Sequence, residues 1–294
     1  MPELPAAASE TAEYRYPDFL CVGAQKAGTS WLDKNLRRHP KLWLPPIKEI
    51  QYFNDLHVPE SRAWTGRHRR DRGAMMMRHY LTKTEAEDWN YRRISVLADI
   101  IASPISDRWY GRIFSLAGAD QMCGEVSPDY ATIPDTGIAH ILKLSPGIRI
   151  VLSLRDPIAR SWSQMRMDIR RGQRKELHEL EAGAMNRDLY NRADYPTIIE
   201  NWRKFIPDDR LHVIFLDDIE ATPEAVLESV CGFLGVGSHA RLSTKAMNPV
   251  HAGEKLEIPP SVLETFKTRY RPIYERFAAL YPEIGAAWMA RHYG

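Results

Sequence analysis

The stretch CVGAQKAGTSW near the start of the chain contains the residues of an anion-binding loop. Gly23 and Gly28 have the glycine spacing of a Walker phosphate-binding loop, G-x-x-x-x-G-K-[ST]. Thr29 stands where that motif has its lysine, and the lysine of this chain, Lys26, lies inside the loop instead. Backbone N–H groups of such a loop at a helix start attract negative charge, whatever the anion is. An anionic group shorter than a triphosphate fits this arrangement, and an ordinary strand-to-helix turn is the alternative interpretation.

The elements that must position this loop alternate along the chain. Apolar runs at 18–23, 148–154 and 211–216 predict buried strands, and helical periodicity follows each of them, first from Thr29. Strands that alternate with helices predict a parallel sheet with crossover helices. We therefore expect a single α/β domain of the P-loop type, with a central parallel sheet flanked by helices and a helical C-terminal segment within 256–292.

Composition and charge limit the function classes. Among 294 residues, 40 are basic and 38 acidic, which argues against a nucleic-acid binder. No apolar run approaches the ~18 residues of a membrane span. Residues 1–16 are expected to form a flexible leader before a domain at 17–294. The cysteines, Cys21, Cys123 and Cys231, are expected to be reduced and buried, as in a cytoplasmic protein.

Two stretches, 56–118 and 165–208, lack clear periodicity and are rich in Arg, Tyr and Trp. As insertions after strand ends, they are expected to be less regular walls over a ligand crevice, and solvated surface is the alternative interpretation. The basic run from Arg62 to Arg72 has two interpretations, an acceptor site in which Trp64 stacks on a ring face, or a charged mobile loop.

The glycine-bounded loop resembles the 5′-phosphosulfate loop of sulfotransferases that use 3′-phosphoadenosine 5′-phosphosulfate (PAPS). Its Q-K-[AT]-G-T-[ST] form is most similar to the heparan sulfate and related carbohydrate sulfotransferases, and to their soluble, bacterial-type members. The resemblance covers about residues 17 to 290. It implies donor binding by Gln25, Lys26, Ala27, Gly28, Thr29 and Ser30.

A second motif of that family places an arginine at a strand end and a serine eight residues later, both on the 3′-phosphate of PAPS. The stretch RIVLSLRDPIARSWSQM provides Arg155 and Ser163 at this spacing. An arginine at a strand end can contact a phosphate through two N–H groups. Without the resemblance, Arg155 beside Asp156 would be interpreted as a surface ion pair.

The segment PIKEIQYFN resembles the family segment that carries the catalytic glutamate, and the matching residue is Glu49. A general base must lie within hydrogen-bond reach of the acceptor proton, and a carboxylate meets that need. The resemblance implies that Glu49 is the base and that Lys48 approaches the sulfonate. The segment CGEVSPDY is similar to the family's acceptor-side motif, and its Glu125 is the rival candidate for the base. Many relatives have lysine where Val126 stands, so the acceptor contact at this position differs.

Towards the C-terminus, the segment VHAGEK occupies the place of a basic loop that closes over the nucleotide in relatives. Its arginine is absent here, and His251, Gly253 and Lys255 are the corresponding candidates.

The resemblance therefore implies sulfuryl transfer from PAPS, which leaves adenosine 3′,5′-bisphosphate, to a hydroxyl or amine of a small molecule or glycan. No metal is expected, because protein donors can neutralise the leaving phosphate. No nucleic-acid partner is expected either, because the net charge is near zero. Two other classes stay open, a P-loop small-molecule kinase that uses ATP and magnesium, and a non-catalytic nucleotide- or glycan-binding module. The acceptor and the oligomeric state are not determined by the sequence.

Overall fold

A computed structural model describes residues 14–102, 104–172, 176–237 and 256–294. Its centre is a five-stranded sheet in which all the paired strands are parallel, in the order β2-β3-β1-β4-β5. The strands are β1 (Phe19–Gly23), β2 (Leu42–Trp43), β3 (Met122–Val126), β4 (Arg149–Leu154) and β5 (Leu211–Phe215). The sheet confirms the predicted α/β class, and β1, β4 and β5 are the three predicted strands.

Helices surround the sheet and make up most of the rest of the described chain. The α-helices are α1 (Thr29–Leu36), α2 (Tyr52–His57), α3 (Arg62–Lys83), α4 (Tyr91–Ala102), α5 (Asp107–Phe114), α6 (Asp135–Leu144), α7 (Pro157–Arg170), α8 (Leu177–Ala184), α9 (Arg187–Asn191), α10 (Tyr195–Arg203), α11 (Leu216–Ala221), α12 (Pro223–Leu234), α13 (Pro260–Leu280) and α14 (Pro282–Tyr293). Short 3-10 turns are η1 (Pro59–Ser61), η2 (Ala86–Asp88), η3 (Pro128–Thr132) and η4 (Asp208–Arg210).

Each strand contributes alternate side chains to the two faces of the sheet. On β1, Phe19 and Cys21 pack with α1 and α12, whereas Leu20 and Val22 belong to the larger core on the opposite face. Every residue of β1 is buried, which explains its continuous apolar sequence. The three cysteines are free and buried, as predicted.

The carboxyl ends of β1, β3 and β4 lie together at one edge of the sheet. Cys21 pairs with Val126 of β3 and with Val151 of β4. The chain therefore leaves three adjacent strands at the same edge, and polar loops begin there. In open α/β sheets, ligands bind at this edge.

The expectation of irregular structure at 56–118 and 165–208 is wrong, because both stretches are largely helical. Helix α3 shows no regular apolar stripe in its sequence, since its buried residues are Thr65, Arg69 and Gly73. Arg69 is stabilised there by an ion pair with Asp55 and by the Ile50 carbonyl, which accepts a hydrogen bond at 3.3 Å. The run from Arg62 to Arg72 is thus part of a helix and not a loop.

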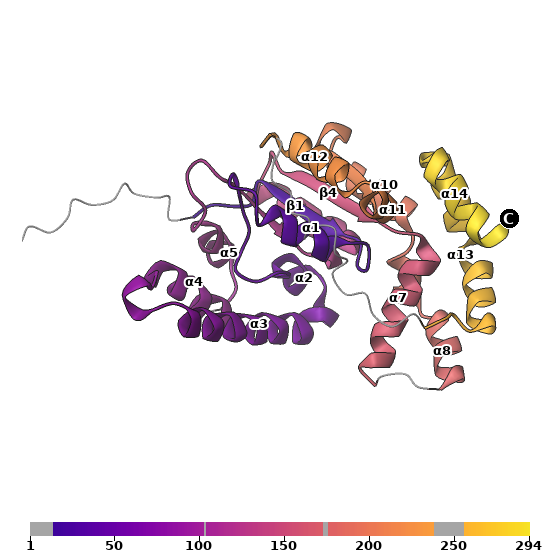
Figure 1. Cartoon of the computed structure of the whole chain (residues 1–294), viewed down its shortest axis with the longest axis horizontal. Helices are drawn as coiled ribbons and strands as arrows, with labels where there is room; N and C mark the ends of the chain where they lie inside the picture. Colours follow the sequence, from indigo (N-terminus) through magenta and orange to yellow (C-terminus); the bar gives the residue numbers. More distant parts are fainter. Residues whose placement is uncertain (1–13, 103, 173–175, 238–255) are drawn as a thin grey trace, which may run out of the picture.

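The two ends of the described chain are packed against the domain. Arg15, inside the predicted leader, donates hydrogen bonds to the carbonyl groups of Gly118 and Gln121. Residues 1–13 lie outside the described ranges. The predicted C-terminal helical segment is confirmed as α13 and α14, which lie beside α7 in Figure 1.

Candidate active site

One large cleft collects most of the predicted site residues. Its volume is about 1480 Å³, above the ~1000 Å³ upper range of ordinary small-molecule pockets, so it has room for a nucleotide and a second substrate. The predicted residues that line it are Gln25, Lys26, Gly28, Thr29, Ser30, Lys48, Glu49, Arg155 and Ser163. Three other candidates, His251, Gly253 and Lys255, lie outside the described residues.

The loop after β1 has the backbone of an anion nest. Lys26 and Gly28 have left-handed φ values of 69° and 86°, and such conformations turn successive N–H groups towards one point. Gly28 is also the N-cap of α1 and provides no side-chain hydrogen bond to it. A side chain at Gly28 would come within 3.0 Å of Leu216 and 3.1 Å of Ile219. Ala27 is fully buried, and its carbonyl accepts a hydrogen bond from Ser153.

Positive charge is concentrated around this loop. Burial, and then the charges of nearby guanidinium groups, lower the pKa of Lys26 to about 8. Those groups belong to Arg170, Arg160, Arg171 and Arg155. The Lys26 ammonium lies 3.7 Å from the Met167 sulfur and has no ion pair among the described residues. A bound anion would relieve this repulsion.

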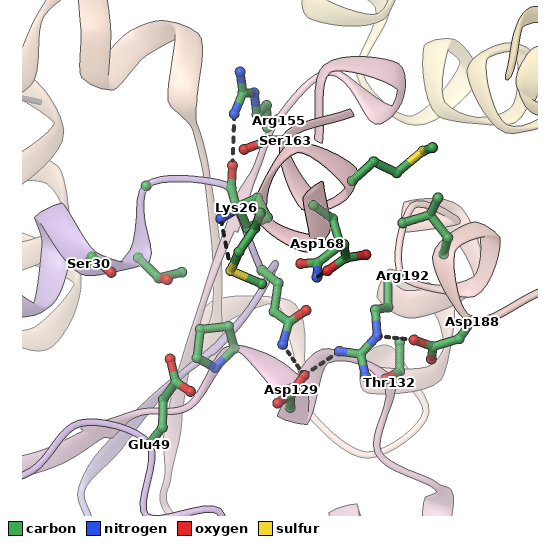
Figure 2. Close-up of a pocket in the computed structure, with 18 of the residues that line it drawn as sticks. Lys26, Ser30, Glu49, Asp129, Thr132, Arg155, Ser163, Asp168, Asp188 and Arg192 are labelled. Atoms are coloured by element: carbon green, nitrogen blue, oxygen red, sulfur yellow. Dashed lines mark hydrogen bonds and ion pairs between the residues drawn. The ribbon is translucent and has the colours of Figure 1, made fainter. Parts of the chain in front are cut away.

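Arg155 and Ser163 lie beside each other above Lys26 in Figure 2. Arg155 follows β4 and donates a hydrogen bond of 3.2 Å to the Lys26 carbonyl. Asp156 caps α7 by accepting from the backbone N–H of Ala159. Its side chain also accepts a 3.0 Å hydrogen bond from Tyr274 of α13 and lies 2.9 Å from His292 of α14. The C-terminal helices thus fix the start of the helix that carries Ser163.

Lys48 connects Glu49 to the glycine-bounded loop. The Lys48 ammonium lies 3.4 Å from a Glu49 carboxylate oxygen, and it lies 3.3 Å and 3.1 Å from the hydroxyls of Thr29 and Ser30. Glu49 has a left-handed φ of 63°, and its N–H donates to the Val126 carbonyl at 3.2 Å. Strained non-glycine residues of this kind cluster at functional sites. Figure 2 shows Glu49 and Ser30 on the same side of the cleft.

Glu125 is buried behind the cleft and does not line it. Its carboxylate accepts hydrogen bonds from Ser127, from Tyr110 at 2.7 Å and from the backbone N–H of Gln51 at 3.3 Å. Burial raises the pKa of Glu125, and these hydrogen bonds oppose the rise. Glu125 therefore holds the segment that contains Glu49 from behind.

The sequence did not indicate a polar network on the cleft floor. Asp129 accepts hydrogen bonds from Gln25, from Gln51 at 2.9 Å, and from Arg192, which also binds Asp188 at 2.8 Å. Figure 2 shows the contacts of Arg192 with Asp129 and with Asp188. Burial lowers the pKa of Arg192, but the charges of Asp129 and Asp188 outweigh it, and the net pKa is raised. The only local signal was that Asp129 follows β3 in the segment CGEVSPDY.

Comparison with known proteins identifies the class. A family model described as "Sulfotransferase family" matches residues 17–239. The chain therefore belongs to the sulfotransferase family, and this confirms the family resemblance.

Individual relatives agree with this assignment. The chain is 20% identical over 347 aligned residues to the membrane-associated sulfotransferase kil1 of Dictyostelium discoideum, with 88% of this chain and 64% of that protein covered. It thus spans less than two thirds of that relative's length. A sulfotransferase structure from Alicyclobacillus acidocaldarius has a TM-score of 0.61 and 21% identity, and covers 93% of this chain and 99% of the other. The sulfotransferase domain of the curacin biosynthetic pathway has a TM-score of 0.52 and 17% identity, with 85% and 82% covered. At these identities the solved structures support the fold.

In the ranges that the structure describes, no helix is both long and apolar enough to cross a bilayer.

Proposed function

We propose that this chain transfers a sulfuryl group from PAPS to a hydroxyl or amine of an acceptor, with Glu49 as general base. One observation carries the proposal. The glycine-bounded loop, the Arg155 and Ser163 pair and Glu49 line one cleft, although they come from three separate segments. The family supports sulfuryl transfer, and this geometry supports the choice of donor and base.

The donor end of the cleft fits a bisphosphate. The left-handed residues Lys26 and Gly28 form the anion nest, and Lys26 has no counter-ion among the described residues. Arg155 and Ser163 provide a second group of donors beyond Lys26, where the 3′-phosphate would bind. Preorganised donors of this kind stabilise the charge that develops on a leaving phosphate.

At the end of the cleft where the acceptor substrate would bind, Glu49 is placed to take the proton. In the reaction the acceptor atom bonds to sulfur, the bond between sulfur and the 5′-phosphate oxygen breaks, and the acceptor proton passes to Glu49. Lys48 lies between the Glu49 carboxylate and the hydroxyls of the donor loop. It is therefore placed to orient the Glu49 carboxylate and to contact the transferred group.

Calorimetry with adenosine 3′,5′-bisphosphate, ADP and 5′-AMP in magnesium-free buffer tests the donor. We expect a strong preference for the 3′-phosphorylated nucleotide, and its loss in Arg155→Ala. Arg203→Ala is the matched control. Arg203, on α10, is exposed and forms an ion pair with Asp208 of η4. Equal binding of the three nucleotides, or a requirement for magnesium, would favour the kinase. Binding without turnover of PAPS in the presence of acceptors would favour the non-catalytic module.

A further inference from the structure

The two ends of the cleft differ in charge. At the donor end, four cationic side chains and two carboxylates line the cleft. The cations are Lys26, Arg155, Arg166 and Arg171, and the carboxylates are Asp168 and Glu220. At the acceptor end, around Glu49 and on the wall opposite it, three cationic side chains and four carboxylates line the cleft. The cations are Lys48, Arg72 and Arg192, and the carboxylates are Glu49, Glu60, Asp129 and Asp188. The side chains that line this end are thus nearly balanced in charge, which favours an uncharged acceptor over a polyanionic one.

An exposed aromatic side chain lies on the wall near Glu49. Trp64 of α3 lines the cleft and is 45% exposed, although large apolar side chains are usually buried. Its ring stacks on His68, with centroids 5.1 Å apart and planes at 24°. His68 in turn donates from Nε2 to the Lys48 carbonyl at 3.3 Å. The Trp64 ring is therefore held in a fixed position relative to the segment that carries Glu49.

The side-chain amide oxygen of Asn54, next to this wall, receives no hydrogen bond from the described residues. Asp129 accepts from the Gln51 amide nitrogen, so the Gln51 carbonyl oxygen must accept, and it does so from Asn54 Nδ2 at 2.8 Å. This chain fixes the orientation of the Asn54 amide. Its Oδ1 is buried and has no donor among the described residues, although Asn54 lines the cleft. Such an atom is expected to bind a hydroxyl or water.

Asn54 and the start of α3 are tied together. The Ser61 hydroxyl donates to the Asn54 carbonyl at 3.2 Å, and both residues line the cleft. The aromatic face of Trp64 therefore shares the cleft with amide, hydroxyl and carboxylate groups. A phenolic acceptor would need an enclosed apolar slot, whereas a sugar ring has one apolar C–H face and several hydroxyls.

We propose that the acceptor is an uncharged sugar ring that stacks on Trp64 and donates a hydroxyl hydrogen bond to Asn54, which places another hydroxyl at Glu49. This proposal rests on the proposed function. It also departs from the heparan sulfate resemblance, because the side chains that line the acceptor end carry no excess positive charge for a sulfated, uronate-rich chain.

A printed glycan array tests the proposal. The array carries neutral, uronate-containing and sulfated glycans, and it is probed with labelled protein saturated with adenosine 3′,5′-bisphosphate. We expect binding to a set of neutral glycans, about tenfold weaker for Trp64→Ala and largely restored in Trp64→Phe. Tyr91→Ala is the matched control, because Tyr91 is 73% exposed on α4 and does not line the cleft. Asn54→Ala, checked for folding by circular dichroism, is expected to weaken the binding of the same glycans.

Three results would overturn the proposal. They are binding of sulfated or uronate-containing glycans alone, neutral-glycan binding that Trp64→Ala leaves unchanged, and no glycan binding by protein that binds the bisphosphate normally. Loss of bisphosphate binding in the wild type would instead count against the proposed function, so the two failures are distinguishable.

Discussion

The unusual pKa of Lys26 predicts a pH dependence of donor binding. Burial and four neighbouring arginines lower this pKa to about 8 in the free protein. The charged form is therefore disfavoured in the free state, and a polyanion bound at the loop favours it again. As the pH rises through 8, the free protein loses the proton on Lys26, and binding must take it up.

The size of the effect follows from the two protonation states. If the bound pKa lies well above 9, bisphosphate affinity falls about tenfold between pH 7 and pH 9, with the uptake of about one proton at pH 9. The phosphate groups do not contribute, because their second pKa is about 6. Below pH 7 the Lys26 term is constant.

Calorimetry at pH 7, 8 and 9, in buffers of different ionisation enthalpy, measures affinity and proton uptake together. Lys26→Met removes the titrating group, so its affinity should be lower at pH 7 and independent of pH up to 9. A wild-type affinity that does not change between pH 7 and 9, or a slope that persists in Lys26→Met, would refute the reasoning.

Three further outcomes are expected. Glu49→Gln should lower turnover about 10²- to 10⁴-fold while bisphosphate affinity, measured by calorimetry, stays unchanged; a comparable loss of binding would contradict its role as base. Gly28→Ala should destabilise the fold in thermal melts by more than the ~1–2 kcal/mol expected for Gly172→Ala, because both glycines have left-handed φ but only Gly28 has close neighbours. Tyr110→Phe should lower the free energy of unfolding in urea by about 1–3 kcal/mol by removing a donor to buried Glu125, whereas exposed Tyr91→Phe should have no effect.

The predictable part of the fold was the part with local physical signals. Strands β1, β4 and β5 are mostly apolar in sequence, and β1, which is buried on both faces of the parallel sheet, is continuously so. Helix α3 was not predicted, since Thr65, Arg69 and Gly73 form its buried face. The ion pair with Asp55 helps to make a buried arginine acceptable there, and no local pattern indicates a partner 14 residues away.

Some site residues could likewise be predicted from the sequence and others could not. Lys26, Arg155 and Ser163 belong to contiguous motifs, so their place in the cleft followed from the sequence. Arg192 and Gln51 did not, because they reach Asp129 across 63 and 78 residues of chain. Such contacts depend on how α9 and η3 pack, which periodicity does not reveal.

Asp156 has a practical consequence for work with this protein. Asp156 caps α7, the helix that carries Ser163, and it also contacts Tyr274 of α13 and His292 of α14. A fusion or surface attachment that strains α14 would be transmitted through Asp156 to the donor pocket and would be recorded as weak nucleotide binding. The C-terminal end is thus a poor handle for immobilisation, but a fluorophore placed there could report whether the donor pocket is filled.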